Sequence, residues 1–409
     1  MKIAIIGAGA AGCFAAINIK RLMPTACVTI YESGTRPLAK LAVTGGGRCN
    51  LTNSFANVKS LESVYPRGHR LMKRLFHEFS HQDAFRWFEN EGVRLVTQED
   101  ECVFPQSQNA MEIVDLLLRR CSELGVEIKT SCRVISLEHH GDTYTINCKS
   151  AAYTAHKVLV ATGGCPRLSG FDWLAPLSLD IIPPVPSLFS VVLKTPDSHD
   201  SSLTSLSGTV VTSVTVGITG TKLRTSGTIL ITHWGASGPA ILRLSSIAAR
   251  YLSENDYQAP LSINWLGGAS DSDIANALEK MAAQNPQKQL QSIYPSTLNS
   301  RLWHHLISQA HLSPTMRWAE MSRKSINRLA DTLANDHYLI SGRWRHKEEF
   351  VTCGGVALSN LNSNTLECKH HQGLYFAGEV TDIDAVTGGF NLQAAWTMGY
   401  VAAISSSSA

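Results

Sequence analysis

The chain opens with an apolar segment, a glycine-rich turn and a helical pattern in direct succession. Lys2–Ile6 is a short apolar run that predicts a buried parallel strand, and Gly7–Gly12 follows it with the spacing G-x-G-x-x-G. Apolar residues through Cys13–Ile19 then predict a helix, and Cys27–Tyr31 predicts a second strand. The first 32 residues therefore predict one strand–turn–helix–strand unit.

Helical and strand-like patterns alternate in the next part of the chain. Arg70–Gly92 has apolar residues at helical spacing, and so has Ala110–Leu124, with Ser107 or Asn109 as its N-cap and Gly125 at its end. Four further strands are predicted: Val126–Thr130, Val134–Leu137, Thr143–Cys148, which alternates as a half-exposed strand does, and the buried run Val158–Ala161.

Residues 188 to about 265 have a different texture, because Ser, Thr, Val and Gly recur in short alternating runs. This pattern predicts a small antiparallel β-barrel or sandwich. Within it, Ser237 is the predicted N-cap of a helix that has Pro239 in its first turn. The amphipathic segment Asp271–Asn335, interrupted by three prolines, predicts a separate helical insert.

The last part of the chain returns to strands. Phe350–Val356 predicts strand and turn, and Leu374–Ala377 predicts a buried strand. A final helix is expected to end near Ile404, with Ser405–Ala409 as a frayed tail.

Composition narrows the class of protein. Hydrophobic residues make up 44% and charged residues 17% of the 409 residues, as in an ordinary globular protein, and the net charge is only +3. Without a clustered basic face, we expect neither nucleic acid nor a membrane as the main partner. Since no apolar run has the length of a membrane span and the glycine fingerprint leaves no room for a signal peptide, a soluble cytoplasmic protein is expected.

The ten cysteines are scattered, and no two of them stand in a C-x-x-C spacing. This argues against a disulfide framework, a zinc site and a dithiol redox centre. We expect most of them to be small buried hydrophobes, and no metal site is predicted.

The opening unit predicts a dinucleotide site. Gly7 allows the tight turn, Gly9 lets the backbone approach a pyrophosphate, and Gly12 lets helix and strand pack closely. Glu32 ends the second strand, 20 positions after Gly12, where a carboxylate binds a ribose that carries no 2′-phosphate. The ligand is therefore FAD or NAD rather than NADP.

Two later segments extend this site. Gly45, Gly46 and Gly47 stand in succession before Arg48 and Asn50, which predicts a backbone pressed against a flat ligand, the alternative being a flexible surface loop.

The second segment lies near the end of the chain. Glu379 follows a buried strand, and the pair Gly388–Gly389 starts the final helix. The acid suits a ribitol hydroxyl, and the helix start suits the N1/C2=O edge of a reduced flavin, so FAD explains both ends of the chain better than NAD. The alternative is a plain C-terminal helix.

Four motifs resemble the bacterial HI0933-like (BaiN/YhiN) family of FAD-dependent oxidoreductases: GGGRCNLTN at 45–53, THWGASGP at 232–239, VTCGGV at 351–356 and GLYFAGEVTDIDAVTGGFN at 373–391. The resemblance covers nearly the whole chain. It implies an α/β fold in which a Rossmann-like FAD-binding domain (1–187 and 353–409) is interrupted by a β-barrel domain (188–268 and 336–352) carrying a small helical insert (269–335). These are also the places where the pattern along the chain changes.

The motifs and the resemblance together predict a set of FAD-binding residues. They are Gly7, Gly9, Ala10, Ala11, Gly12, Glu32, Ser33, Lys40, Thr44, Gly45, Gly46, Gly47, Arg48, Cys49, Asn50, Leu51, Thr52, Val134, Ala161, Thr162, Gly163, Gly164, Gly378, Glu379, Asp384, Gly388, Gly389, Phe390 and Asn391.

The chain departs from the family pattern at three places. Glu101–Cys102 stands where members often carry Gly-Arg, Cys165–Trp173 replaces a longer Ser-Thr-Gly-Asp-Gly-Tyr stretch, and Cys368 replaces a serine. Substrate handling is therefore expected to differ more than FAD binding.

The chemistry expected of the site is that of the flavin, with the protein placing a hydride donor or acceptor beside it. The chain has no second G-x-G-x-x-G, so either NAD(P)H visits the flavin transiently or the substrate is the hydride donor. His233 is the candidate catalytic acid or base, with a packing role as the alternative. Cys49 is expected to be an inert thiol.

The leading hypothesis is an FAD-dependent oxidoreductase of a small or medium organic substrate, with NAD(P)H as reductant. One alternative is an oxygen-using amine oxidase that releases peroxide. Another is a flavin-loaded sensor or a relative of RNA-modification proteins. The substrate and the oligomeric state stay open.

Overall fold

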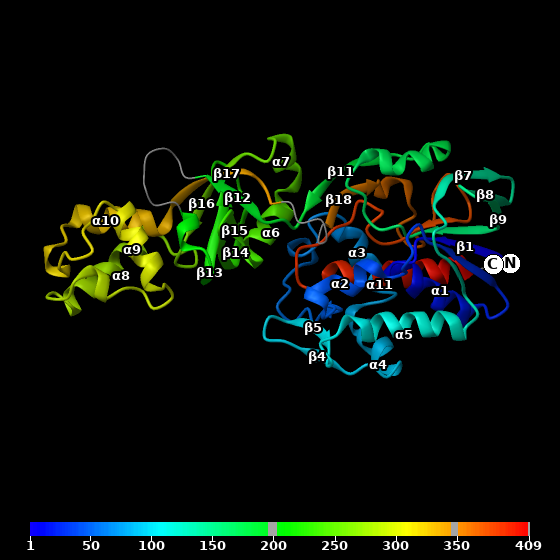
Figure 1. The fold of residues 1–409 in the computed structure, drawn as a ribbon, viewed down its shortest axis with the longest axis horizontal. Helices are drawn as coiled ribbons and strands as arrows, with labels where there is room; N and C mark the ends of the chain where they lie inside the picture. The colour runs from blue at the N-terminus through cyan, green and yellow to red at the C-terminus, as the bar shows by residue number, and fades with distance from the viewer. Residues whose placement is uncertain (195–202, 345–350, 408–409) are drawn as a thin grey trace. The chain divides into compact units, whose positions relative to one another are not determined.

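The computed structural model describes residues 1–194, 203–344 and 351–407, which belong to two compact units (Figure 1). Unit 1 is formed by residues 1–187 and 348–409, and unit 2 by residues 188–347. Unit 1 therefore combines both ends of the chain.

A five-stranded parallel sheet forms the centre of unit 1, in the order β19-β10-β1-β2-β6. Its strands are β1 (Lys2–Ile6), β2 (Cys27–Tyr31), β6 (Glu127–Lys129), β10 (Lys157–Val160) and β19 (Leu374–Phe376). Because all five run in one direction, the residues that follow them meet at a single edge, where a doubly wound sheet binds its ligand.

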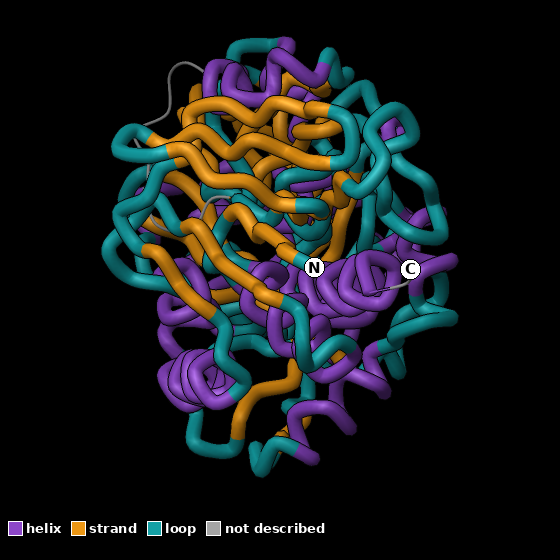
Figure 2. The backbone as a smooth tube through the Cα atoms, turned by 90° about the vertical axis from the view of Figure 1, so that its right-hand side faces the viewer, coloured by secondary structure: helices purple, strands orange, loops and turns teal. Residues whose placement is uncertain are grey.

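Two helices cover one face of this sheet, α1 (Ala10–Leu22) and α11 (Phe390–Ser407), and they pack against each other (Figure 2). Their crossing is close, because a Cβ added at Gly399 would lie 2.8 Å from the carbonyl oxygen of Ala11. The other face packs against an antiparallel sheet and a long 3-10 segment, η2 (Leu168–Leu177). That second sheet contains β7 (Val134–His140), β8 (Thr143–Cys148) and β9 (Ala152–Ala155).

The other elements of unit 1 surround this layered core. They are α2 (Ala39–Gly47), β3 (Thr52–Asn53), η1 (Leu61–Ser63), α3 (His69–Leu75), α4 (His81–Asn90), β4 (Leu95–Thr97), β5 (Cys102–Pro105), α5 (Ala110–Glu123), β11 (Ile181–Ser187), β18 (Val351–Val356) and η6 (Leu358–Asn360). Strands β11 and β18 pair antiparallel, with Ser187 opposite Val351.

The segment Arg70–Gly92, predicted as one helical stretch, contains a break between α3 and α4. Ser80 starts α4 with a capping box, since its hydroxyl accepts from the N–H of Asp83 and the Asp83 carboxylate accepts from the N–H of Ser80. For α5 the predicted capping residue Asn109 is confirmed, because its side chain accepts from the N–H of Met111.

Unit 2 contains a closed six-stranded barrel in the order β12-β15-β14-β13-β16-β17. Its strands are β12 (Val191–Lys194), β13 (Val210–Ile218), β14 (Arg224–Thr232), β15 (Gly235–Ser237), β16 (Ala259–Asn264) and β17 (Asp336–Arg343). Its helices and 3-10 turns are η3 (Leu203–Leu206), α6 (Pro239–Ile247), α7 (Ala249–Glu254), α8 (Asp271–Gln284), η4 (Leu290–Ser292), α9 (Ser300–Gln309), η5 (Trp318–Glu320) and α10 (Arg323–Ala334).

Two local predictions were wrong. Ser237 does not cap α6: it lies in β15 with its hydroxyl 2.7 Å from that of Ser190, and Gly238 takes the N-cap position with a φ of 92°. The expected frayed tail is helical as far as Ser407, because Ser406 is buried and its carbonyl accepts from the Lys157 ammonium at 2.9 Å. Phe350 and the last two residues of the predicted tail lie outside the described residues.

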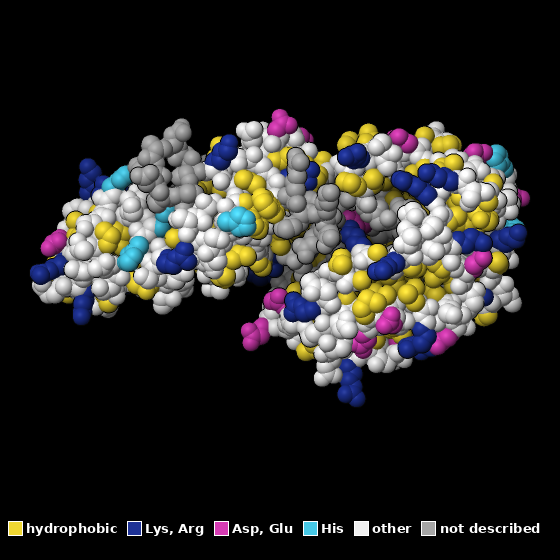
Figure 3. Space-filling view, viewed as in Figure 1, with side chains coloured by type: hydrophobic (Ala, Val, Ile, Leu, Met, Phe, Trp, Pro, Cys, Tyr) yellow, Lys and Arg dark blue, Asp and Glu magenta, His cyan; other side chains and the backbone are white. Residues whose placement is uncertain are grey.

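Two further observations concern the charged side chains on the surface and the length of the apolar helices. On the visible face of unit 1, side chains of Lys and Arg are spread among those of Asp and Glu (Figure 3). Across residues 1–194, 203–344 and 351–407, none of the helices combines the length and apolarity needed to cross a membrane.

Candidate functional site

The three glycines of the fingerprint have three different surroundings. A Cβ at Gly7 would lie 2.5 Å from the carbonyl oxygen of Ala161, and a Cβ at Gly12 would lie 2.1 Å from that of Gly7. At Gly9, by contrast, the nearest atom to an added Cβ is 4.0 Å away. Gly7 and Gly12 therefore permit close backbone packing, whereas Gly9 faces open space at the start of α1, where the first N–H groups of the helix lack intrahelical acceptors.

Glu32 lies beside this helix start. One carboxylate oxygen accepts from the N–H of Ala8 at 2.8 Å, and the other accepts from the N–H of Gly34 at 2.7 Å and from the Ser33 hydroxyl at 3.3 Å. The segment that leads to Val134 runs alongside, because the N–H of Cys132 donates to the carbonyl of Glu32 at 2.8 Å. These bonds fix the carboxylate next to the glycine turn, and the remaining lone pair of the oxygen that accepts from Ala8 is available to a ribose.

A second group forms around Glu379, just after β19. Lys40 of α2 donates to one oxygen of the Glu379 carboxylate at 2.5 Å, and the backbone N–H of Thr352 donates to the other at 2.8 Å. A Cβ at Gly164 would lie 2.6 Å from Glu379, and a Cβ at Gly378 would lie 3.2 Å from the Ala11 side chain. The turn after β10, where Thr162 and Gly163 precede Gly164, and the turn after β19 thus meet the start of α1.

The glycine loop and the start of α11 form the third group. The amide of Asn50 bridges the carbonyl of Thr52, at 3.0 Å, and the N–H of Gly389, at 3.2 Å. Asn53 donates to the carbonyl of Gly388 at 3.0 Å, and the indole of Trp396 donates to the carbonyl of Leu51 at 2.9 Å. This loop and the helix start are therefore held as one piece.

Within the loop, Gly46 and Gly47 have open space on the side where a Cβ would project, with φ values of 67° and 81°. Thr44, Gly45 and Gly46 leave helical geometry although they continue α2. The backbone here is accessible to a flat ligand.

Arg48 and Cys49 differ in accessibility. The Arg48 guanidinium is exposed and lies 4.5 Å from the centre of the Phe104 ring. The Cys49 thiol is fully buried, and this burial raises its pKa to about 12. A thiol in this state is a poor nucleophile at neutral pH.

Asp384 and its neighbours form a buried ionic cluster. The carboxylate is fully buried, accepts from the Arg67 guanidinium through both oxygens and from the Ser187 hydroxyl at 2.9 Å. Burial raises the pKa of Asp384, while the Arg67 hydrogen bonds oppose that shift. The side-chain amide of Asn391 accepts from the N–H of Ala385, the residue after Asp384, and donates to its carbonyl, both at 2.9 Å. Tyr65 donates to the carbonyl of Phe390 at 2.8 Å. A direct contact of Asp384 with FAD stays a prediction.

His233 belongs to unit 2, in the turn between β14 and β15, and its side chain is exposed. Its ring meets that of Trp234 edge-on at 4.3 Å, and Trp234 stacks on Trp344 at 4.2 Å with an interplanar angle of 9°. The catalytic role of His233 stays a prediction.

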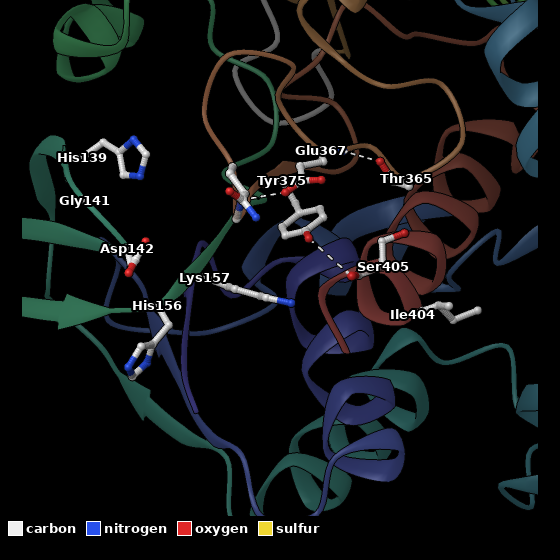
Figure 4. Close-up of a pocket in the computed structure, with 12 residues that line it drawn as sticks. His139, Gly141, Asp142, His156, Lys157, Thr365, Glu367, Tyr375, Ile404 and Ser405 are labelled. Atoms are coloured by element: carbon white, nitrogen blue, oxygen red, sulfur yellow. Dashed lines mark hydrogen bonds between the residues drawn. The ribbon is translucent and has the colours of Figure 1, made fainter. Parts of the chain in front are cut away.

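A groove of about 720 Å³ lies at the opposite edge of the parallel sheet. Lys157 begins β10 and Gly373 directly precedes β19, so the groove is at the amino ends of the strands (Figure 4). The Tyr375 hydroxyl closes one side by donating to the carbonyl of Ser405 at 3.3 Å. This groove is separate from the residues predicted to bind FAD, which follow the carboxyl ends.

Three features of this part of unit 1 fit an extended dinucleotide. A helix start with open space at Gly9 suits a pyrophosphate, Glu32 suits a ribose, and the open backbone at Gly46 and Gly47 suits a flat ring system. In residues 1–194, 203–344 and 351–407, no three His, Cys, Asp or Glu side chains come together as metal ligands would.

Sequence reasoning missed three residues that support the site. Thr352 holds Glu379, Arg67 neutralises Asp384, and Gln393 accepts from the Thr52 hydroxyl at 2.6 Å. Thr352 stands in the motif VTCGGV and could have been found there, whereas Arg67 and Gln393 carry no local signal.

Comparison with known proteins agrees with this geometry. The family model described as "HI0933-like protein Rossmann domain" matches residues 1–405. The chain is 28% identical over 405 residues to the ribosomal RNA dihydrouridine synthase of Escherichia coli, covering 98% of this chain and 96% of that protein. It is 25% identical over 413 residues to the 3-dehydro-bile acid delta(4,6)-reductase of Clostridium scindens, covering 98% of each.

A likeness to a solved structure is more distant. The quinol fumarate reductase of E. coli has 13% identity and a TM-score of 0.49, with 100% of this chain and 70% of that chain covered. A likeness of this size adds nothing to the assignment.

Proposed function

The chain belongs to the HI0933-like family, and from this premise we propose that it reduces a carbon–carbon double bond conjugated to a carbonyl group, with NAD(P)H as the reductant. It is an FAD-dependent oxidoreductase; the substrate class and the reductant are what we propose. The observation that supports the flavin part of the proposal is the start of α1, which has open space at Gly9 and the Glu32 carboxylate beside it, at the carboxyl edge of the parallel sheet.

The substrate class comes from a chemistry that the names of two relatives share. Dihydrouridine differs from uridine by two hydrogens at a ring double bond next to a carbonyl, and a delta(4,6) pair in a 3-oxo steroid is conjugated to its ketone. In both cases a flavin can deliver a hydride to the carbon β to the carbonyl. Chain-wide identity of 28% and 25% supports the same reaction type here.

The protein's own residues would hold and orient the cofactor. The N–H groups at the start of α1 bind the pyrophosphate, Glu32 binds the ribose, and Lys40 holds Glu379 in place by a 2.5 Å hydrogen bond. The start of α11 at Gly389 and Phe390 presents its positive end toward the loop that carries Gly46. Bound FAD would supply the hydride chemistry.

The single glycine fingerprint suggests that NAD(P)H and the substrate bind at the same face of the flavin. Since the sequence has no second G-x-G-x-x-G, NAD(P)H and the unsaturated substrate would use that face in turn. Initial rates should then give parallel lines in double-reciprocal plots when both concentrations are varied.

The test is anaerobic and has two steps. NADH and NADPH are mixed separately with the FAD-loaded protein while absorbance at about 450 nm is followed, with free FAD as control. We expect bleaching by at least one of them, and then recovery when a cyclic enone or a 3-oxo-4,6-diene steroid is added. A flavin that stays oxidised with both nucleotides but is bleached by an amine, with peroxide released in air, would replace the proposal by an amine oxidase.

A second candidate substrate is a uridine of ribosomal RNA. The specific observation in its favour is the aromatic stack of Trp234 and Trp344 with exposed His233 at its edge, since unpaired bases stack on such rings. The low net charge of +3 counts against it. Unmodified ribosomal RNA should then reoxidise the reduced protein and gain two hydrogens at one uridine, and Trp234→Ala should weaken RNA binding about tenfold.

A further inference from the structure

Two cysteines that are distant in sequence bring their sulfur atoms together in unit 1. The Sγ atoms of Cys132 and Cys148 are 3.1 Å apart, although the two residues are separated by 16 positions. Cys132 lies just before β7, and Cys148 is the last residue of β8, opposite Val134 in the antiparallel register. The pairing of these two strands therefore holds the two thiols next to each other.

The pair combines contact with limited access to solvent. Both residues are 7% exposed, and both belong to the core cluster that contains Tyr31 and Phe171. Cys13 and Cys121 also interact with each other, but both are 0% exposed. Cys132 and Cys148 thus keep a small exposure to solvent that Cys13 and Cys121 lack.

The position of the pair links it to the predicted cofactor site. The N–H of Ser131 donates to the carbonyl of Gly34, and the N–H of Cys132 donates to that of Glu32, both at 2.8 Å. The backbone that carries the Cys132 thiol thus supports the turn in which the Glu32 carboxylate is held. A covalent bond at Cys132 would fix that support to the end of β8.

We propose that Cys132 and Cys148 are a modification site, at which hydrogen peroxide forms a reversible disulfide. One thiolate attacks a peroxide oxygen, the O–O bond breaks, and a sulfenic acid and one water are formed. The second sulfur then displaces the sulfenic oxygen, which leaves as a second water, so two thiols lose two electrons and peroxide gains them. The sulfurs must approach by about 1 Å to reach bonding distance.

The reaction should be slow at neutral pH. Burial, followed by the hydrogen bond with Cys132, raises the pKa of Cys148 to about 12, so little of its thiolate is present. An incubation with a small molar excess of peroxide should therefore be followed over hours, and a dithiol reductant should reverse the product.

Mass spectrometry of a tryptic digest tests the proposal on the full-length protein. Arg133 separates the two cysteines, so after peroxide and alkylation a disulfide appears as residues 130–133 linked to residues 134–149. We expect this linked species, its loss after reduction, and alkylated Cys13 and Cys121. Recovery of Cys132 and Cys148 as separate alkylated or sulfinic peptides would overturn the proposal.

Matched variants and a second readout complete the test. Cys132→Ser and Cys148→Ser should each abolish the linked species, whereas Cys27→Ser, at an exposed cysteine, should leave it unchanged. In the wild-type protein, amide exchange across β7 and β8 should slow at least about fivefold on oxidation, because the link suppresses local opening. If the oxidised protein, with the disulfide verified, exchanged these amides as fast as the reduced protein, the disulfide would not stabilise the backbone that supports the Glu32 turn. None of these outcomes depends on the reaction that the protein catalyses.

Discussion

Gly9 and Gly12 stand three positions apart in the same fingerprint, yet an added methyl group would meet different surroundings at each. At Gly9 the nearest atom is 4.0 Å away and the φ of −89° suits any residue, so Gly9→Ala should fold normally. The methyl would occupy space that a pyrophosphate needs, so we expect FAD affinity to fall about tenfold or more. Fluorescence titration of the apoprotein with FAD measures this change.

Gly12→Ala is the matched comparison. Its Cβ would lie 2.1 Å from the carbonyl oxygen of Gly7, so helix and strand must separate. We expect the free energy of unfolding to fall by about 3 kcal/mol. If Gly9→Ala bound FAD as tightly as the wild type, the assignment of the α1 start to the pyrophosphate would be wrong.

Asp336 gives unit 2 a predicted dependence on pH. Burial raises the pKa of Asp336 from 3.8 to about 6, while hydrogen bonds from Tyr338 and Trp265 oppose the shift. Between these two pKa values, the Asp336 carboxyl therefore keeps its proton in the folded state but has lost it in the unfolded chain. The contribution of Asp336 to the free energy of unfolding should be fully present below about pH 4 and should fall by about 3 kcal/mol as the pH rises through 6.

Denaturant titrations from pH 4 to 7, followed by tryptophan fluorescence, measure this fall. Asp336→Asn should remove most of it, since an amide carries no charge to bury. Asp256→Asn, at an exposed aspartate of the same unit, should keep it. An Asp336→Asn protein whose stability had the same pH dependence as that of the wild type would contradict the raised pKa of Asp336.

At the scale of elements, the glycine loop depends on α11. The buried Thr52 hydroxyl donates to Gln393 at 2.6 Å, and Gln393 donates to Thr397 at 3.0 Å. Thr52→Val keeps the shape but leaves the Gln393 oxygen without this donor, so unfolding should require about 1–3 kcal/mol less free energy. Urea denaturation measures the loss.

A double-mutant cycle with Gln393→Leu isolates the energy of the interaction between Thr52 and Gln393. The losses in the free energy of unfolding caused by the two single substitutions should not add in the double variant. Thr143→Val removes an exposed hydroxyl–carbonyl bond of 3.3 Å and should change stability by less than about 0.5 kcal/mol. Additive losses for Thr52 and Gln393 would show that the loop and the helix are held by other contacts.

At the scale of the whole molecule, unit 1 is interrupted between two paired strands. Ser187 at the end of β11 lies opposite Val351 at the start of β18, so a two-residue Asn-Gly turn can join them as a hairpin. We expect a chain of residues 1–187 and 351–409 joined in this way to fold and to bind FAD with an affinity within about tenfold of the wild type. Absorbance of the purified protein after FAD loading measures this.

A chain that ends at residue 187 is the control. It lacks β19 and α11, which supply one edge of the parallel sheet and half of its helical cover, so it should not fold cooperatively. A joined chain that is colourless in excess FAD, while the wild type is yellow, would mean that unit 2 is needed for cofactor binding.

The sequence alone determined the features that depend on local spacing. The G-x-G-x-x-G turn, Glu32 at a strand end and the glycine pair before the last helix are short-range patterns, and each predicts its own backbone geometry. Parallel strands then place their following residues at one edge whatever the details of packing. The HI0933-like family and the use of FAD could therefore be predicted before the fold was known.

Only the tertiary structure decided which distant side chains meet. Arg67 and Asp384 are separated by 317 positions, and Thr52 and Gln393 by 341, so no spacing rule relates them. The contact of Cys132 with Cys148 arises from the pairing of two strands, although the cysteine spacing argued against a dithiol centre. Such contacts follow from how layers pack, a property of the whole chain that local patterns do not contain.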